Sequence, residues 1–156
     1  MPNVKKVTVT AHQTESMRMD LQARHHRMII DQPATGGGQD AGPTPLEYFV
    51  AALAGCMGAI GRIVARQQKL NIRWMDFVVE GDIDVDGLLG RPTPNRVGFQ
   101  GFTVKARIDG DLSMDQKQAF LRAVEQRCPV SENIANATPI RFEVVEDLGG
   151  IKGPAV

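Results

Sequence analysis

The sequence predicts an α+β fold in which a mostly antiparallel sheet is built around one long helix. Two observations lead to this expectation. Segments with the two-residue alternation of strands precede and follow a single long apolar stretch, and two shorter helical patterns come near the end of the chain. Strands and helices that are grouped in this way, rather than alternating, are typical of α+β proteins. The 156 residues suit one hydrophobic core, so we expect a single domain over residues 1–156.

The long helix is expected over residues 45–69. Pro45 suits a first helical turn, because its missing N–H costs nothing there. Between Tyr48 and Ile60 the segment has no polar face, which is typical of a helix buried on all sides. The charge-free run is shorter than the roughly 20 residues of a membrane span, so we expect no membrane contact.

Small residues are frequent in this helix and predict that another element approaches it closely. Glycine in a helix interior costs about 1 kcal/mol relative to alanine, so its repeated use needs a compensating contact. The chain's own sheet could supply that contact, and so could the same helix of a second copy. The sequence leaves both open.

Three strands are expected before the long helix and three after it. They cover residues 4–10, 17–23 and 26–31, and then residues 72–85, 98–108 and 140–146. In the second strand the alternation places Arg18 on the face opposite the methionines. The glycine-rich loop at residues 36–38 leads from the third strand towards the helix.

Two shorter helices are expected between the fifth strand and the last one. Ser113 begins the first of them, with Gln116 as its capping-box partner. Cys128 follows its apolar stripe at helical spacing, and Pro129 ends the helix because proline disfavours helical geometry in the residue before it. The second short helix is expected over residues 129–137.

Charge and cysteine content narrow the classes of function. The 18 basic and 18 acidic residues cancel, so the overall charge does not point to nucleic acid. The first residues, MPNVKK, lack the apolar segment of a secretory signal, so we expect a cytoplasmic protein. Two cysteines in that setting favour thiol chemistry over a structural disulfide.

The two cysteines are the candidate reactive groups, although lone cysteines are often only small buried apolar residues. Cys56 lies in the middle of the apolar helix, where burial raises a thiol pKa, so it needs a nearby cation to react as a thiolate. Arg18, Arg24 and Arg27 are candidates for that cation, and Arg18 is our first choice. Cys128 lies at the start of the next helix, whose positive end lowers a thiol pKa. Physical chemistry alone therefore makes Cys128 the readier thiolate.

We expect neither a metal nor a bound cofactor. The run DIDVDG at residues 82–87 matches the start of a calcium loop, but Thr93 occupies the position that needs a bidentate glutamate. His25 and His26 project to opposite sides of a strand, which suits no common zinc site.

The run GGGQDAGPTPLEYFVAALAGC, followed about seventy residues later by RCPVSENI, resembles the OsmC/Ohr family of osmotically inducible and organic hydroperoxide resistance proteins. The match is closer to its OsmC-like branch and covers nearly the whole chain. The resemblance implies an intertwined homodimer, with mostly antiparallel sheets wrapped around central cysteine-bearing helices. It implies a thiol peroxidase that reduces organic hydroperoxides without a metal or flavin, as part of an antioxidant stress response.

The resemblance also implies roles for individual residues. Cys56 matches the peroxidatic cysteine, which becomes a sulfenic acid, and Cys128 matches the resolving cysteine, which forms a disulfide that a dithiol reductant reopens. An arginine from an early strand, by position Arg18, would activate the thiolate, and Glu47 would hold that arginine. Glu47 lies one position closer to the cysteine than the glutamate of the hydroperoxide branch, where this chain has Leu46. Nine helical residues separate Glu47 from Cys56, which puts the two on opposite sides of an ideal helix.

A protein of another class on the same fold is the alternative. It would be a dimer that binds a hydrophobic ligand or senses redox state through its thiols, without significant peroxidase activity.

Overall fold

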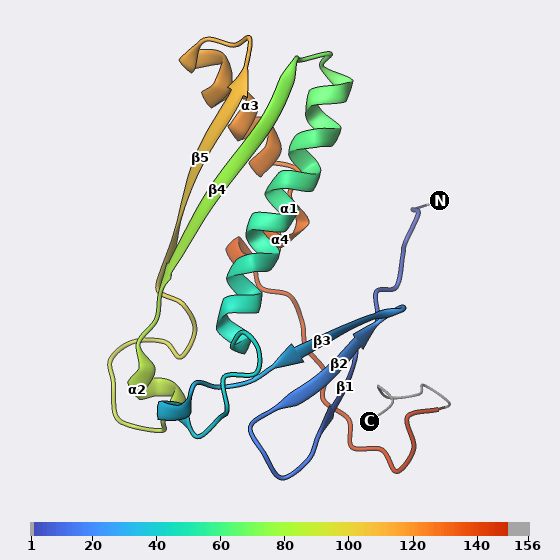
Figure 1. Cartoon of the computed structure of the whole chain (residues 1–156), viewed down its shortest axis with the longest axis vertical. Helices are drawn as coiled ribbons and strands as arrows, with labels where there is room; N and C mark the ends of the chain where they lie inside the picture. Colours follow the sequence, from blue (N-terminus) through green and yellow to red (C-terminus); the bar gives the residue numbers. More distant parts are fainter. Residues whose placement is uncertain (1, 150–156) are drawn as a thin grey trace. The chain divides into compact units, whose positions relative to one another are not determined.

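The computed structural model describes residues 2–149, and Figure 1 shows the order of its helices and strands. The described chain forms two compact units. The first contains residues 2–48 together with residues 140–149, and the second contains residues 49–139. Helices and antiparallel strands are both present, as the sequence predicts.

The first unit contains an antiparallel sheet of three strands in the order β1–β2–β3. The strands are β1 (Thr10–Gln13), β2 (Met19–Ala23) and β3 (His26–Ile30). The expectations for β2 and β3 are confirmed to within two residues. The strand expected over residues 4–10 is wrong, because pairing begins only at Thr10, which lies opposite Gln22. The valines before it remain exposed, since alternation alone cannot form a strand without a neighbour.

Asp31 organises the glycine-rich loop that follows β3. Its side chain is fully buried, and its carboxylate accepts backbone N–H groups from Gln32, Gln39 and Ala41 at 2.8 to 3.1 Å. Those N–H groups, that of Ala41 first, lower the pKa of the Asp31 carboxyl below its usual value against the opposing effect of burial. At Gly38 any side chain would collide with the backbone carbonyl of Gln32. The loop is therefore fixed by a buried charge rather than loosely connected.

The long helix α1 (Pro45–Gln67) confirms the expectation for residues 45–69, apart from its last two residues. Thr44 and Glu47 close its first turn, since the backbone N–H of each donates to the other's side chain, at 2.7 Å to Glu47 Oε2 and 3.3 Å to Thr44 Oγ1. By length and composition alone α1 is long and apolar enough to cross a membrane, which its short charge-free run did not suggest.

The expectation that α1 is buried on all sides is wrong within a single chain. One face is buried in the core of the second unit through Leu53, Met57, Gly61, Val64 and Ala65. The opposite side remains exposed, and we call it the open stripe. The open stripe consists of Ala52, Gly55, Ala59 and Ile63. These positions recur every three to four residues, which places them along one line of the helix.

The second unit packs α1 against an antiparallel pair of strands, β4 (Ile72–Asp82) and β5 (Gly101–Gly110). Figure 1 shows α1 running alongside both strands. Alternate side chains of the pair face the helix, so the two-residue period of the sequence is confirmed here. Gly61 permits close approach, because a Cβ there would lie 3.0 Å from the sulfur of Met75.

Three further helices complete the second unit. The short α2 (Val85–Leu88) follows β4 and was not expected from the sequence. Helix α3 (Met114–Glu125) begins with the expected capping box of Ser113 and Gln116. Helix α4 (Pro129–Ala135) confirms the second short helix. The buried side chains of α3, Phe120 and Val124, join those of α1 in one core, and Val130 and Ile134 of α4 pack against it.

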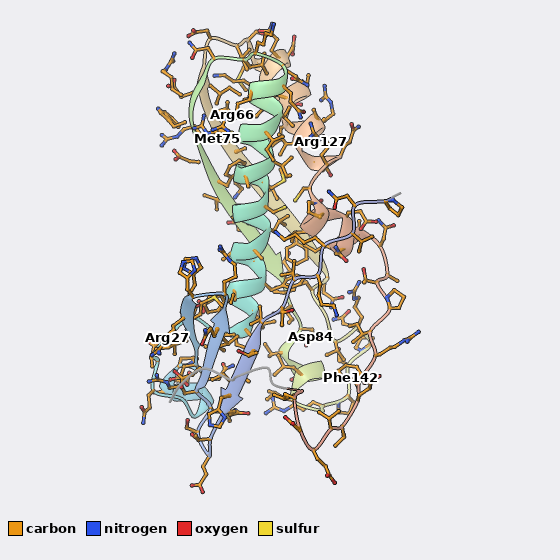
Figure 2. The ribbon with its side chains drawn as sticks, turned by 90° about the vertical axis from the view of Figure 1, so that its right-hand side faces the viewer. Arg27, Arg66, Met75, Asp84, Arg127 and Phe142 are labelled. Atoms are coloured by element: carbon orange, nitrogen blue, oxygen red, sulfur yellow. The ribbon has the colours of Figure 1, made fainter. Side chains whose placement is uncertain are left out.

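The strand expected over residues 140–146 is wrong. This segment contains no strand in the structure, although Ile140, Phe142 and Val144 alternate with polar residues as a strand would. Phe142, labelled in Figure 2, is 92% exposed. A strand needs a neighbour to satisfy its backbone hydrogen bonds, and the segment is unpaired within the described chain.

Candidate functional site: a pair of neighbouring thiols

The two cysteines are placed by different helices of the second unit. Cys56 lies near the middle of α1, between the buried face of that helix and its open stripe, and is half-buried. Cys128 is the N-cap residue of α4 and is fully buried. Pro129 occupies the first turn of α4, and so the chain turns between α3 and α4 at Cys128.

The fold brings these two thiols together across a sequence separation of about seventy residues. The Cys128 side chain is close enough to Cys56 to raise the pKa of its thiol, and both cysteines are free thiols. The first turn of α4 contacts both sulfurs. The backbone N–H of Val130 faces the Cys56 thiol, and that of Ser131 donates to Cys128 Sγ at 3.4 Å. The two thiols are thus neighbours at the first turn of α4.

The environment of Cys56 favours the neutral thiol. Burial raises its pKa above the usual value, and the neighbouring Cys128 thiol raises it further, while the Val130 N–H acts in the opposite direction. Among residues 2–149, none of the groups that shift this pKa is a cation. Cys128 lies at the start of α4, as the sequence predicts, and the backbone N–H of Ser131 in the first turn of that helix donates to its sulfur.

Arg18 belongs to the first unit, where it forms an ion pair with Asp20. Its Nη2 and Nε donate to the two carboxylate oxygens at 2.6 and 3.2 Å. This guanidinium lowers the pKa of the Asp20 carboxyl. Arg24 forms the turn between β2 and β3 with a positive φ of 57°, and Arg27 lies in β3. The role of Arg18 as the activating cation stays a prediction.

Glu47 is bound to the start of its own helix. Its carboxylate accepts both the N–H and the hydroxyl of Thr44, at 2.7 and 2.9 Å, and these contacts lower its pKa. Arg18 and Glu47 therefore have different partners in this structure. A carboxylate is favourable at a helix N-terminus, and the observed contacts of Glu47 agree with that simpler role.

A cluster of three aromatic rings, from α1, the loop before β5 and β5 itself, was missed from the sequence. Phe49 stacks on Phe99, with ring centroids 5.8 Å apart, and Phe102 lies 4.7 Å from Phe99. Gly81 makes room for the cluster, because a Cβ there would lie 2.8 Å from the Phe102 ring. Phe49 precedes Cys56 by seven residues, about two helical turns, so both lie on the same side of α1. The seven-residue spacing of Phe49 and Cys56 was the signal in the sequence that could have indicated this shared side.

The acidic run at residues 82–87 serves the loop after β4. Asp84, labelled in Figure 2, caps α2 by accepting the N–H of Asp86 at 3.0 Å. It also accepts the Thr93 hydroxyl and the Asn95 amide, at 2.5 and 2.9 Å. The residues that resemble a calcium loop are thus used to hold the segment between α2 and β5.

Comparison with known proteins places the chain in a family. The family model described as OsmC-like protein matches residues 36–143, which include both cysteines. The chain belongs to the OsmC-like protein family. No curated protein sequence matches it.

Solved structures of this family share the fold. An OsmC-like protein from Mycoplasma pneumoniae superposes with a TM-score of 0.74 at 22% identity, covering 85% of this chain and 89% of the other. The organic hydroperoxide resistance protein OhrB of Bacillus subtilis gives 0.57 at 21% identity, covering 85% and 93%. An OsmC-like protein of unknown function from Vibrio cholerae gives 0.70 at 11% identity, covering 83% and 94%. The OsmC-like fold thus occurs both in hydroperoxide resistance proteins and in proteins without an assigned activity.

Proposed function

We propose that this OsmC-like protein is a thiol peroxidase that reduces organic hydroperoxides through Cys56 and Cys128. The observation that carries the proposal is the contact between the two thiols at the first turn of α4. Two free cysteines that are distant in sequence and adjacent in space can alternate between dithiol and disulfide, which a structural cysteine has no need to do.

The proposed cycle has two steps and an exchange with a reductant. The Cys56 thiolate attacks one oxygen of the peroxide, the O–O bond breaks, and the leaving alkoxide takes a proton to become an alcohol. Cys56 is then a sulfenic acid. The Cys128 sulfur attacks the Cys56 sulfur, water leaves, and a disulfide forms. A dithiol reductant in the cytoplasm returns both thiols by exchange.

Cys56 is proposed as the attacking thiol because it is more exposed than Cys128 and can meet a substrate. Its raised pKa means that a cation must approach to give a thiolate at neutral pH. Arg18 remains our candidate for this role, which would require it to exchange its contact with Asp20 for one with the site. Glu47 remains the candidate for holding it.

We also propose that the protein is a homodimer that covers the open stripe of α1. Ala52, Gly55 and Ala59 would let a second helix approach closely, and a Cβ at Gly55 meets nothing within 4 Å in the single chain. The exposed, alternating segment 140–146 would gain its missing strand neighbour from the second copy.

Light scattering of the wild type should give twice the chain mass. Gly55→Arg should give the monomer mass, whereas Met114→Arg, at an exposed position on α3, should leave the dimer intact.

The peroxidase proposal is tested by the consumption of an organic hydroperoxide, cumene hydroperoxide, in the presence of dithiothreitol. We expect turnover by the wild type and none by Cys56→Ser. Cys128→Ser should still react once with the peroxide. If only Cys128→Ser abolishes the reaction, the two roles are reversed. If the wild type shows no turnover and keeps both thiols free after peroxide treatment, the proposal is wrong.

The second candidate is a dimeric protein that binds a hydrophobic ligand or senses redox state. The raised pKa of Cys56 favours it, because a neutral thiol is a poor nucleophile. Its mark would be a ligand that stays bound through purification and whose affinity is unchanged by Cys56→Ser.

A further inference from the structure

The first unit contains a cleft whose lining residues all belong to that unit, and Arg18 is the one among them that the proposed cycle also uses. Its volume is about 510 Å³, which lies within the usual range for small-molecule sites. One side is formed by β2 and β3, including Arg18, Arg27 and Ile29. The other is formed by the end of the glycine-rich loop and by Tyr48.

The loop side of this cleft is held in place by buried contacts. Asp31 accepts the N–H of Ala41 at 3.1 Å and donates its own backbone N–H to the carbonyl of Pro43 at 3.3 Å. Gly42 lies between them, where a Cβ would be 2.5 Å from the carbonyl oxygen of Ile29. Only glycine fits this close approach, which holds the loop wall of the cleft against β3.

The charges that line the cleft leave one cation available. The guanidinium of Arg18 is paired with Asp20. Arg27, labelled in Figure 2, is exposed and forms no ion pair within residues 2–149. Arg18 also interacts with the buried carboxylate of Asp31, so Arg27 is the guanidinium of this cleft that is left without an ion-pair partner among the described residues. A guanidinium in this situation suits the two oxygens of a carboxylate.

The remaining lining of the cleft is largely apolar. It includes Leu21, Met28, Ile29, Pro43 and the ring of Tyr48. A fully hydrated inorganic anion would gain nothing from these side chains, whereas a hydrocarbon body would. The cleft therefore combines one available cation with apolar walls.

We propose that this cleft binds a small amphipathic carboxylate, with the carboxylate on Arg27 and its hydrocarbon body against the apolar walls. Binding here does not depend on the thiols, because every residue that lines the cleft belongs to the first unit. The proposal rests on Arg27, which the peroxidase cycle does not use, so a variant of Arg27 tests it apart from the peroxidase proposal.

Titration of the full chain with sodium octanoate, followed by the NMR signals of the methionine methyl groups, tests this site. The Met28 methyl should shift to saturation, while that of Met57, buried in the other unit, should not. Arg27→Gln should weaken binding by about tenfold or more, the effect of losing a charged hydrogen bond. Arg107→Gln, at an exposed ion pair on β5, should leave the affinity unchanged. Cys56→Ser should bind octanoate as the wild type does.

Octanol and octyl phosphate separate the contributions of chain and charge. Octanol should bind more weakly than octanoate, because it lacks the carboxylate. Equal binding of octanol and octanoate would overturn the role of Arg27, as would an unchanged affinity in Arg27→Gln. Saturable binding of octyl phosphate but not of octanoate would overturn the assignment to carboxylates. A Met28 signal that never saturates below the onset of micelles would overturn the site itself.

Discussion

Oxidation of the thiol pair should stabilise the folded chain. A Cys56–Cys128 disulfide would close a loop of about 70 residues, and a closed loop lowers the conformational entropy of the unfolded chain. The two thiols are already neighbours in the folded chain, so the bridge would join groups that the fold has brought together. The chain-entropy relation for a loop of this length gives a stabilisation of about 4 kcal/mol.

Urea denaturation of the reduced and oxidised protein measures this effect. The oxidised sample is prepared with one equivalent of hydroperoxide and checked for the loss of two hydrogens by mass spectrometry. We expect its free energy of unfolding to exceed that of the reduced protein by up to about 4 kcal/mol. Cys128→Ser is the matched control, since it cannot form the bridge and should show no gain. An oxidised protein that is less stable than the reduced one, or that is linked only between chains, would refute the reasoning.

Three further effects follow from individual side chains. In Cys128→Ala the pKa of Cys56 should fall, because Cys128 raises it, and half-maximal alkylation by iodoacetamide should move to lower pH. The pKa of Asp31 is lowered in the folded chain. Its contribution to the free energy of unfolding should therefore be complete above about pH 4, the usual carboxyl pKa, and be lost as the pH falls through the pKa of the folded state. Asp31→Asn should remove this part of the pH dependence of urea unfolding. Ser113→Ala should lower the free energy of unfolding by about 1 kcal/mol, through loss of the α3 cap, in the same urea assay.

Each of these effects has an outcome that contradicts it. An alkylation profile unchanged by Cys128→Ala would mean that the two thiols do not interact. An Asp31→Asn protein with the acid sensitivity of the wild type would mean that the buried carboxylate does not control the loop. A Ser113→Ala protein as stable as the wild type, with Asp115→Asn as a control at the same helix end, would mean that the capping box contributes nothing.

The elements set by local interactions were predictable from the sequence. Pro45 and the apolar run after it gave α1, and Ser113 with Gln116 gave the start of α3. Each of these signals acts within one or two helical turns, so the rest of the fold cannot easily override it. The alternation along β4 was reliable for a related reason, because Ile72, Met75, Phe77 and Val79 face the core to which α1 contributes.

The elements that depend on a distant partner were not predictable. Residues 4–10 and 140–146 have the alternation of strands, but the single chain gives them no neighbour. The burial of α1 failed for the same reason, since its open stripe has no covering element in the described chain. All three discrepancies concern apolar surface that a second copy of the chain could cover, in keeping with the proposed homodimer.

The candidate site was only partly predictable. The positions of Cys56 and Cys128 on their helices followed from the sequence, but their contact depends on how α4 packs against α1. The role of Asp31 was missed because the sequence shows it only as the last residue of a strand. Its partners, the N–H groups of Gln39 and Ala41, come close only because the following loop folds back. A lone acid just before a proline and three glycines was the available signal.

Trapping of the sulfenic acid tests the central claim most directly. Cys128→Ser protein is treated with one equivalent of cumene hydroperoxide and then with dimedone, and the modified residue is located by peptide mass spectrometry. We expect a single adduct on Cys56, because the attacking thiol is then oxidised and has no partner to resolve it. If Cys56 stays unmodified while Cys128 carries the adduct in Cys56→Ser, Cys56 is not the attacking thiol. If neither variant is modified, the chain is not a thiol peroxidase.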